Sequence, residues 1–260
     1  MHILIFGASG HVGTGLAEHL APAHRITGVV RKQPEGPTPY APLVLPDWVD
    51  RPESVVTELQ RTRAPRVDAV IAAIGGWYVD GTMIGRGIGS FDDDFGSYLR
   101  GHFAACSASE SLAEVGAEDG SADDADGAES TESAESADGT ESTESAESAD
   151  GPDAGHERSD STRLRHLALN GVASVEACVG SGAISVFGAA QEMLVMVAAA
   201  ESESVDFREL KVMAPIGGDE RNDLSGGVET VSLARVADTV AGLLSRPVDD
   251  EISSQLHALA

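Results

Sequence analysis

Cysteine and lysine are scarce in this chain of 260 residues. Cysteine occurs only at Cys106 and Cys178, without a Cys-x-x-Cys pair or a histidine cluster, so we expect neither a disulfide scaffold nor a metal site. Lysine occurs only at Lys32 and Lys211. No apolar run reaches about 18 residues, the length that crosses a membrane, so we expect no membrane span.

Basic residues are few as well, because 17 lysines and arginines stand against 43 acids and give a net charge of −26. Nucleic acids and anionic membranes are both negative, so this balance argues against either partner and leaves a small-molecule substrate or none. An acid-rich, lysine-poor composition suits a halophile, although a GC-rich genome also favours arginine over lysine.

The first six residues, from Met1 to Phe6, contain no basic region and no long apolar stretch. They therefore predict a β-strand rather than a signal peptide. From this we expect a cytoplasmic protein.

Most of the negative charge lies in one segment: from Glu110 to Asp160 there are 18 acids and a single base, Arg158. Residues 128–139 (AESTESAESADG) and 140–151 (TESTESAESADG) form a near-perfect tandem repeat. The repeat cannot bury enough apolar surface to offset its chain entropy, so we expect residues 116–160 to be a disordered acidic insert. It is either a tolerated expansion of a surface loop or an acidic segment that binds a basic partner.

Strand and helix signals alternate along the rest of the chain, which predicts βα units and a mainly parallel sheet. We expect a single doubly wound α/β Rossmann domain of about seven strands, formed by residues 1–115 and 161–260. The expected strands are His2–Phe6, His24–Val30, Leu43–Leu45, Val67–Ala72, Leu164–Leu169, Phe207–Ala214 and Ile252–Leu259. The expected helices are Val12–Leu20, Pro52–Arg63, Phe91–Val115, Gly188–Glu201 and Leu233–Ser245.

A glycine-rich turn follows the first strand, with Gly7, Gly10 and Gly13 spaced three residues apart. Gly7 allows a tight turn, Gly10 lets the backbone approach a pyrophosphate, and Gly13 lets the helix pack against the strand. The free N–H groups of the next helix point at the phosphates. Between a strand and a helix, this spacing predicts a dinucleotide-binding site, in which Ser9 and His11 either assist phosphate binding or fill space.

The end of the second strand bears on which dinucleotide binds. NAD sites usually place an acid there for the ribose hydroxyls, whereas this chain has Arg31 and Lys32. Two cations suit a 2′-phosphate, so the sequence favours NADP(H) over NAD(H) as cofactor. The alternative is that both are solvated loop charges.

Outside the insert, the chain resembles the short-chain dehydrogenase/reductase family. Four stretches besides the glycine turn are similar to family segments: 47–55 (DWVDRPESV), 72–76 (AAIGG), 214–217 (APIG) and 231–245. The resemblance implies that the first Asp of the first stretch, Asp47, contacts the adenine ring, that the second stretch lies beside the adenosine ribose and that the third faces the nicotinamide. The cofactor-binding candidates are thus Gly7, Ser9, Gly10, His11, Val12, Gly13, Arg31, Lys32, Asp47, Trp48, Ala73, Ile74, Gly75, Gln191, Pro215 and Ile216.

The catalytic end departs from the family, which uses a Tyr-x-x-x-Lys pair and a serine after the fifth strand. The resemblance aligns Phe187 with the tyrosine, Gln191 with the lysine, and Asn170 or Gly171 with the serine. Phenylalanine has no proton to give, and glutamine has no charge to lower a pKa, although its amide can bind a ribose hydroxyl. Tyr98 and His102 are weak substitutes, and Asn170 could polarise a carbonyl. Trp77 and Tyr78 follow the fourth strand and could line a substrate cleft.

Two functions remain open. The first is an NAD(P)-dependent oxidoreductase that acts on a carbonyl or alcohol with an altered proton relay. The alternative is a non-catalytic NADP(H)-binding sensor or regulatory protein. Single-domain relatives often pair through the helices beside strand five, which predicts a homodimer or homotetramer. Ligands bind outside the carboxyl ends of the strands, so we expect the insert at the opposite edge of the sheet.

Overall fold

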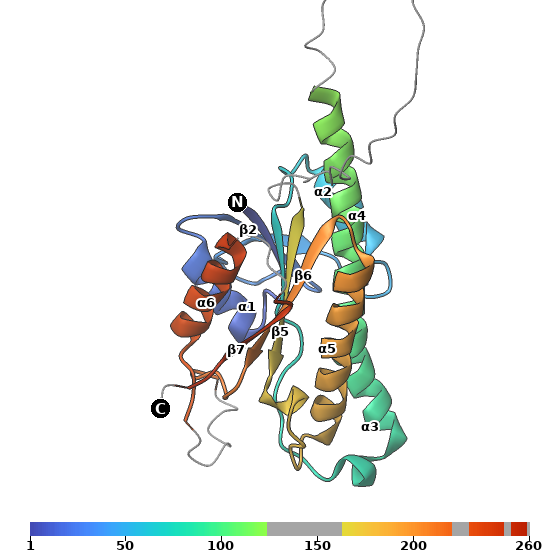
Figure 1. Ribbon diagram of the computed structural model, residues 1–260, viewed down its shortest axis with the longest axis vertical. Coiled ribbons are helices and arrows are strands. Elements are labelled where there is room, and N and C mark those ends of the chain that lie inside the picture. Colours follow the sequence, from blue (N-terminus) through green and yellow to red (C-terminus); the bar gives the residue numbers. More distant parts are fainter. Residues whose placement is uncertain (124–162, 220–228, 247–250, 259–260) are drawn as a thin grey trace, which may run out of the picture.

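The computed structural model describes residues 1–123, 163–219, 229–246 and 251–258, and its centre is one seven-stranded sheet (Figure 1). The strand order is β3-β2-β1-β4-β5-β6-β7, and every neighbouring pair is parallel. The strands are β1 (His2–Phe6), β2 (Arg25–Val30), β3 (Ala41–Val44), β4 (Ala69–Ala72), β5 (Leu164–Gly171), β6 (Val205–Val212) and β7 (Ser253–Leu256). The expected Rossmann-type parallel sheet is confirmed.

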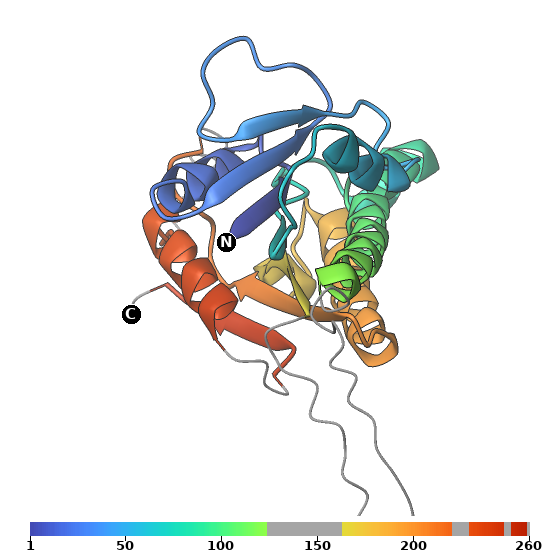
Figure 2. The same cartoon turned by 90° about the horizontal axis from the view of Figure 1, so that it is seen from above.

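Helices cover both faces of this sheet (Figure 2). On one face Leu16 of α1 and Val236 of α6 belong to one buried cluster with the strands. On the other face a second cluster takes Leu59 of α2, Ala105 of α4 and Val195 of α5. The helices are α1 (His11–Leu20), α2 (Glu53–Arg61), α3 (Met83–Ser97), α4 (Leu99–Asp123), α5 (Gly182–Glu201) and α6 (Leu233–Ser245).

The prediction of one long helix over Phe91–Val115 is wrong. The structure has two helices there, α3 and α4, separated at Tyr98, and α3 begins eight residues before the expected start. Thr82 caps α3 by accepting a hydrogen bond from the Gly85 backbone N–H (3.2 Å). Gly87, with φ +80°, kinks the helix, and the glycines around it weaken the helical pattern in the sequence.

Two other helix ends differ from expectation. The α5 helix begins at Gly182 rather than Gly188, and α4 runs to Asp123, inside the expected insert. The rest of the expected insert, 124–160, lies outside the described residues.

Because the sheet is parallel, all its strands end on the same side of it, which is called the carboxyl edge below. The chain moves from β3 back across β1 to β4, so the strand order reverses between β1 and β4. The loops after β1, β4, β5 and β6 all start at this carboxyl edge, where doubly wound folds bind ligands. Leu164 starts β5 at the opposite edge, and the expected insert precedes it.

Replacing residues 124–158 by a short Gly-Ser linker should leave dinucleotide affinity within about threefold, because their attachment points lie at the edge away from the ligand loops. Isothermal titration calorimetry on both proteins measures this. The thermal unfolding curve serves as the control for folding. A much larger loss of affinity in a folded variant would contradict the placement.

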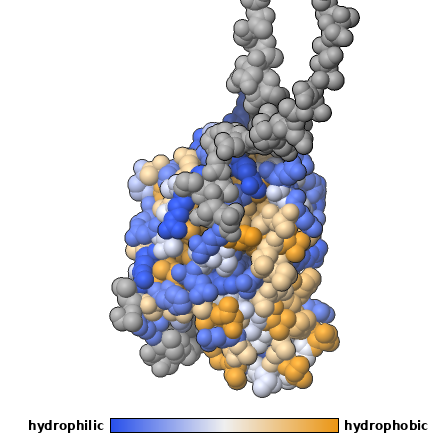
Figure 3. Space-filling view, viewed as in Figure 1, coloured by the Kyte–Doolittle hydropathy of each residue, from blue (hydrophilic) through white to orange (hydrophobic). Residues whose placement is uncertain are grey.

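The outer face of α5 is apolar and exposed. Met193 is 57% exposed, and Met196 and Val197 are each 43% exposed. Figure 3 shows hydrophobic surface over the part of the molecule where α5 runs. Within the described residues, α5 alone is long and apolar enough to cross a membrane by length and composition, yet it packs against β6 and α4. We therefore propose that its face pairs with the same face of a second copy, as the expected dimer requires.

Replacing Met196 by glutamate should shift a dimer or tetramer toward the monomer, because a desolvated charge would face its own copy across the two-fold axis. Light scattering coupled to gel filtration measures the mass. Gly242→Glu is the matched control, since Gly242 lies exposed on α6, on the other side of the sheet. A wild-type monomer at micromolar concentration would refute the pairing.

Candidate functional site

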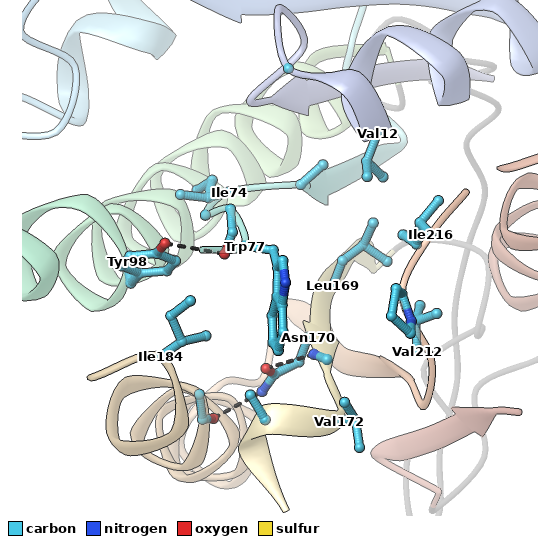
Figure 4. Close-up of a pocket in the computed structure, with 18 of the residues that line it drawn as sticks. Val12, Ile74, Trp77, Tyr98, Leu169, Asn170, Val172, Ile184, Val212 and Ile216 are labelled. Carbon is cyan, nitrogen blue, oxygen red and sulfur yellow. Dashed lines mark hydrogen bonds between the residues drawn. The ribbon is translucent and has the colours of Figure 1, made fainter. Parts of the chain in front are cut away.

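A cavity opens at the carboxyl edge of the sheet, between α5 and the loops that follow β1, β4, β5 and β6 (Figure 4). Four segments distant in sequence meet there, because parallel strands deliver their following loops to one edge. The residues that line it are Gly10, His11, Val12, Ala73, Ile74, Gly75, Gly76, Trp77, Tyr98, Leu169, Asn170, Gly171, Val172, Ala173, Ile184, Gly188, Gln191, Val212, Ala214, Pro215, Ile216 and Asp219.

The glycine turn at one end of the cavity has no room for side chains at two positions. A Cβ at Gly7, whose φ is +78°, would lie 2.2 Å from the carbonyl oxygen of Ala73. A Cβ at Gly13 would lie 2.2 Å from the carbonyl oxygen of Gly7. The turn, α1 and the end of β4 are therefore packed backbone to backbone, which is the role expected of these glycines.

The N-terminus of α1 is suited to an anion. Its N-cap residue is Gly10, which has no side chain to accept a hydrogen bond from the helix N–H groups. The first turn of the helix contains no acid. Its free N–H groups thus remain for a phosphate. His11 ties the turn to the loop after β6, because its Nε2 lies 2.9 Å from the Gly217 carbonyl oxygen.

The structure brings most of the cofactor-binding candidates together. Gly7, Ser9 and Gly13 belong to the turn at the end of the cavity, and nine more line it. The nine are Gly10, His11, Val12, Ala73, Ile74, Gly75, Gln191, Pro215 and Ile216. Their contact with a dinucleotide stays a prediction.

The four other candidates lie outside the cavity lining. Arg31 and Lys32 are exposed directly after β2, at the carboxyl edge, and neither makes a hydrogen bond or ion pair within the described structure. Asp47 lies 3.5 Å from Arg51, with which it forms an ion pair. Trp48 is only 6% exposed and packs on Phe6, with ring centroids 4.6 Å apart. The structure thus leaves two free cations at this edge and places Trp48 in the core.

The helix that should carry the family's catalytic pair presents other residues to the cavity. Phe187 packs instead on Phe91 and Phe95 of α3, with ring centroids 4.7 and 5.8 Å apart. Ile184 and Gly188, one helical turn apart, line the cavity. The sequence pointed to neither residue, because an isoleucine and a glycine carry no chemical signal.

Two polar side chains at the floor of the cavity are bound to the protein itself. Gln191 donates its amide to the carbonyl oxygen of Leu169 (2.9 Å). Asn170 donates to the carbonyl oxygen of Gly188 (2.9 Å) and to Glu209 Oε1 (2.7 Å). Asn170 Oδ1 in turn accepts from the Gly171 N–H (2.9 Å). Both amide hydrogens of Asn170 are therefore engaged, whereas Gln191 uses one of its two for the protein.

A buried charge network supports Asn170 from β6. Glu209 is 1% exposed, and burial raises the pKa of its carboxyl, while Asn170 and Lys211 act to lower it. Lys211 Nζ lies 3.6 Å from Glu209 Oε2 and donates to Glu192 Oε1 at 2.5 Å. The one lysine of the core is therefore paired beneath the cavity and does not line it.

The two substitutes for the proton donor differ in position. Tyr98 lines the cavity, and its hydroxyl donates to the carbonyl oxygen of Gly76 (3.1 Å). His102 is fully buried outside the lining, and burial lowers its pKa to about 4. His102 is therefore neutral near pH 7, with Nε2 at 3.3 Å from the Ile74 carbonyl oxygen. A catalytic role for either residue stays a prediction.

The loop after β4 places Trp77 in the cavity, whereas Tyr78 anchors that loop. The Tyr78 hydroxyl donates to Asp94 (2.6 Å), and Arg86 binds both residues. Burial and the bond to Asp94 raise the pKa of Tyr78 to about 12. Figure 4 shows the Trp77 indole standing within the cavity, near Asn170 and Leu169.

No family model matches the sequence, and no curated protein shows a significant match. Solved structures do match the fold. A short-chain dehydrogenase from Bacillus anthracis is 12% identical, with 98% of this chain and 93% of that chain covered and a TM-score of 0.66. One from Burkholderia cenocepacia, in complex with NADP, is 14% identical (100% and 88% covered, TM-score 0.64). ElxO with NADP bound is 11% identical (98% and 96% covered, TM-score 0.67). The chain therefore has the fold of short-chain dehydrogenase/reductase structures.

Replacing Lys211 by methionine should destabilise the fold by about 3–5 kcal/mol near neutral pH, because Glu209 is left buried without its cation. A carboxyl whose folded pKa is raised favours the protonated form, so the loss should shrink as the pH falls toward about 5. Urea unfolding at about pH 5 and pH 8, at constant salt, measures both values.

The double variant Lys211→Met/Glu209→Gln is the matched control for this charge effect. It removes the unpaired carboxylate and should recover a large part of the lost stability. An equal loss at both pH values, with no recovery in the double variant, would show that packing rather than charge is responsible.

Proposed function

We propose that this protein, which has the fold of short-chain dehydrogenase/reductase structures, is an NADP(H)-binding oxidoreductase with an altered proton relay. The observation that carries the proposal is the backbone cradle at the reversal of strand order. There Gly7 and Gly13 leave no space for a Cβ, and the uncapped N-terminus of α1 faces the cavity. A backbone cradle next to free N–H groups fits a pyrophosphate.

Residues of suitable chemistry for the 2′-phosphate, the adenosine ribose and the nicotinamide lie along the same carboxyl edge of the sheet. Arg31 and Lys32 would hold the 2′-phosphate, Ala73 and Gly75 would lie beside the adenosine ribose, and Pro215 would face the nicotinamide. When bound, the nicotinamide supplies or accepts a hydride at its C4 atom. Two solved structures with this fold have NADP bound, which supports the cofactor class.

The chain's own residues bind and orient rather than transfer a proton in this proposal. Among the described residues that line the cavity there is no lysine, and the Asn170 and Gln191 amides are bound within the protein. A missing general acid typically costs a factor of about 10² to 10⁴ in rate. Turnover of a simple carbonyl substrate should accordingly be slow.

The absence of a lysine from the described cavity lining also favours the second candidate, a sensor that binds NADP(H) without turnover. A cofactor end without the Tyr-x-x-x-Lys pair is what a sensor would retain. Oxidation of NADPH against aldehydes, ketones and quinones separates the two functions. NADPH binding without turnover of any acceptor, tested up to saturating salt, would favour the sensor.

NADPH should bind the wild-type protein at least about tenfold more tightly than NADH, and Arg31→Asp should reverse this preference, because an acid repels the 2′-phosphate and binds the ribose hydroxyls. Dissociation constants from titration calorimetry measure both effects. Arg25→Asp is the matched control, since Arg25 is exposed at the other end of the same strand. NADH binding at least about tenfold tighter than NADPH in the wild type would refute the assignment.

A further inference from the structure

The indole of Trp77 is the largest side chain that lines the cavity, and it stands across the middle of it. In the view of Figure 4 the ring lies between Tyr98 and Ile184 on one side and Leu169 and Ile216 on the other. Ile216 belongs to the loop after β6, where the candidates for the nicotinamide end of the cofactor lie. A ligand beside that loop therefore meets the indole before it reaches the part of the cavity next to Tyr98.

The position of the ring depends on packing rather than on a hydrogen bond. Trp77 Nε1 is inaccessible to solvent and has no hydrogen-bond partner in the described part of the chain. The nitrogen edge of the indole therefore lies against the protein, and the ring offers only apolar surface to the cavity. Its role at this place is to fill space.

The loop that carries Trp77 is fixed on its far side. The Asp80 N–H donates to the carbonyl oxygen of Gly180 (2.9 Å), and Ser181 Oγ donates to the carbonyl oxygen of Tyr78. Gly180 has φ +83°, and a Cβ there would lie 2.9 Å from the Asp80 carbonyl oxygen. These contacts join the loops after β4 and β5, so the loop cannot move away from the cavity without breaking them. The indole is therefore a wall that stands in place before a ligand arrives.

The described lining residues offer no cation to a negatively charged substrate. They contain no lysine and no arginine, and Asp219 is the one acid among them. Their other polar side chains include the Tyr98 hydroxyl and the neutral amides of Asn170 and Gln191. Gln191 donates one amide hydrogen to the main chain and keeps the other. Because a desolvated carboxylate or phosphate without a cation is costly, this lining fits an uncharged compound.

We infer, on the basis of the proposed function, that Trp77 is a specificity-determining residue that restricts the cavity to a compact, uncharged carbonyl compound. The compound lies on the cofactor side of the indole, and a second fused ring on it would collide with the indole. Its carbonyl carbon takes the hydride, with both bonding electrons, from the reduced nicotinamide. A proton from water goes to the oxygen, so the products are an alcohol and the oxidised cofactor.

The test of size compares acetophenone with 2-acetonaphthone, which carries one more fused ring. Calorimetry on the NADP⁺-loaded protein measures the Kd of each ketone without chemistry, because the oxidised cofactor holds no hydride to transfer. The wild type should bind acetophenone at least about tenfold more tightly, since the larger ketone has to displace the indole. Trp77→Ala should remove this preference, while its Kd for NADPH stays within about twofold of the wild-type value.

Two further variants keep the size test decisive. Trp77→Phe has a smaller aromatic ring and should give an intermediate ratio of the two Kd values, and it is the milder change if Trp77→Ala does not fold. Ile84→Ala is the matched control, because Ile84 is 81% exposed on α3 and lies outside the lining. It should keep the wild-type ratio. Thermal unfolding curves check that each variant is folded.

The test of charge compares 4-acetylbenzoate with 4′-methylacetophenone, which have similar shapes but differ by a carboxylate. The wild type loaded with NADP⁺ should bind the methyl compound at least about tenfold more tightly, because the carboxylate finds no cation. The Trp77 variants should keep this preference, since the indole carries no charge.

The outcomes separate this inference from the proposed function. Absence of NADPH binding overturns the proposed function itself, and NADPH binding without reduction of any acceptor overturns the oxidoreductase while the Kd ratios still decide the inference. Failure of both ketones to bind the loaded wild type overturns only the inference. Equal affinity for the two ketones in the wild type, or a ratio that neither Trp77 variant changes, does the same. Tighter binding of 4-acetylbenzoate overturns the uncharged substrate class.

Discussion

The close packing of three backbone segments at the end of β1 is the constraint on which the rest of the site depends. The carbonyl oxygen of Ala73 lies where a Cβ of Gly7 would be, and the carbonyl oxygen of Gly7 lies where a Cβ of Gly13 would be. This contact sets α1 close to the sheet, directs its N-terminus at the cavity and joins β1 to β4 at the reversal of strand order. A side chain at either glycine would separate these segments and widen the phosphate end of the cavity.

The floor of the cavity is held by a different kind of interaction. Glu209, Lys211 and Glu192 bring charges into the region below Asn170, where pairing offsets part of the desolvation cost. The network uses Lys211, the lysine of the core, for structure, and Glu209 together with the Gly188 carbonyl occupies both Asn170 amide hydrogens. The polar floor is therefore a rigid support.

The sequence predicted the strands well, because their short apolar runs are bounded by turn residues and leave little freedom of assignment. It failed on α3, where Gly85, Gly87 and Gly89 interrupt the helical pattern although Thr82 and tertiary packing stabilise the helix. Trp48, a cofactor-binding candidate next to Asp47, packs its ring on Phe6. Local patterns do not show which side of a loop residue faces the core.

The sequence by itself determined the doubly wound sheet, the glycine turn and the absence of a Tyr-x-x-x-Lys pair, since each depends on residue type and spacing along the chain. Only the tertiary structure decided which side chains are free to act. The hydrogen bonds of Asn170, Gln191 and Tyr98 arise between segments far apart in sequence. A donor is available to a ligand only when no such partner has already bound it, and that is a property of the packed fold.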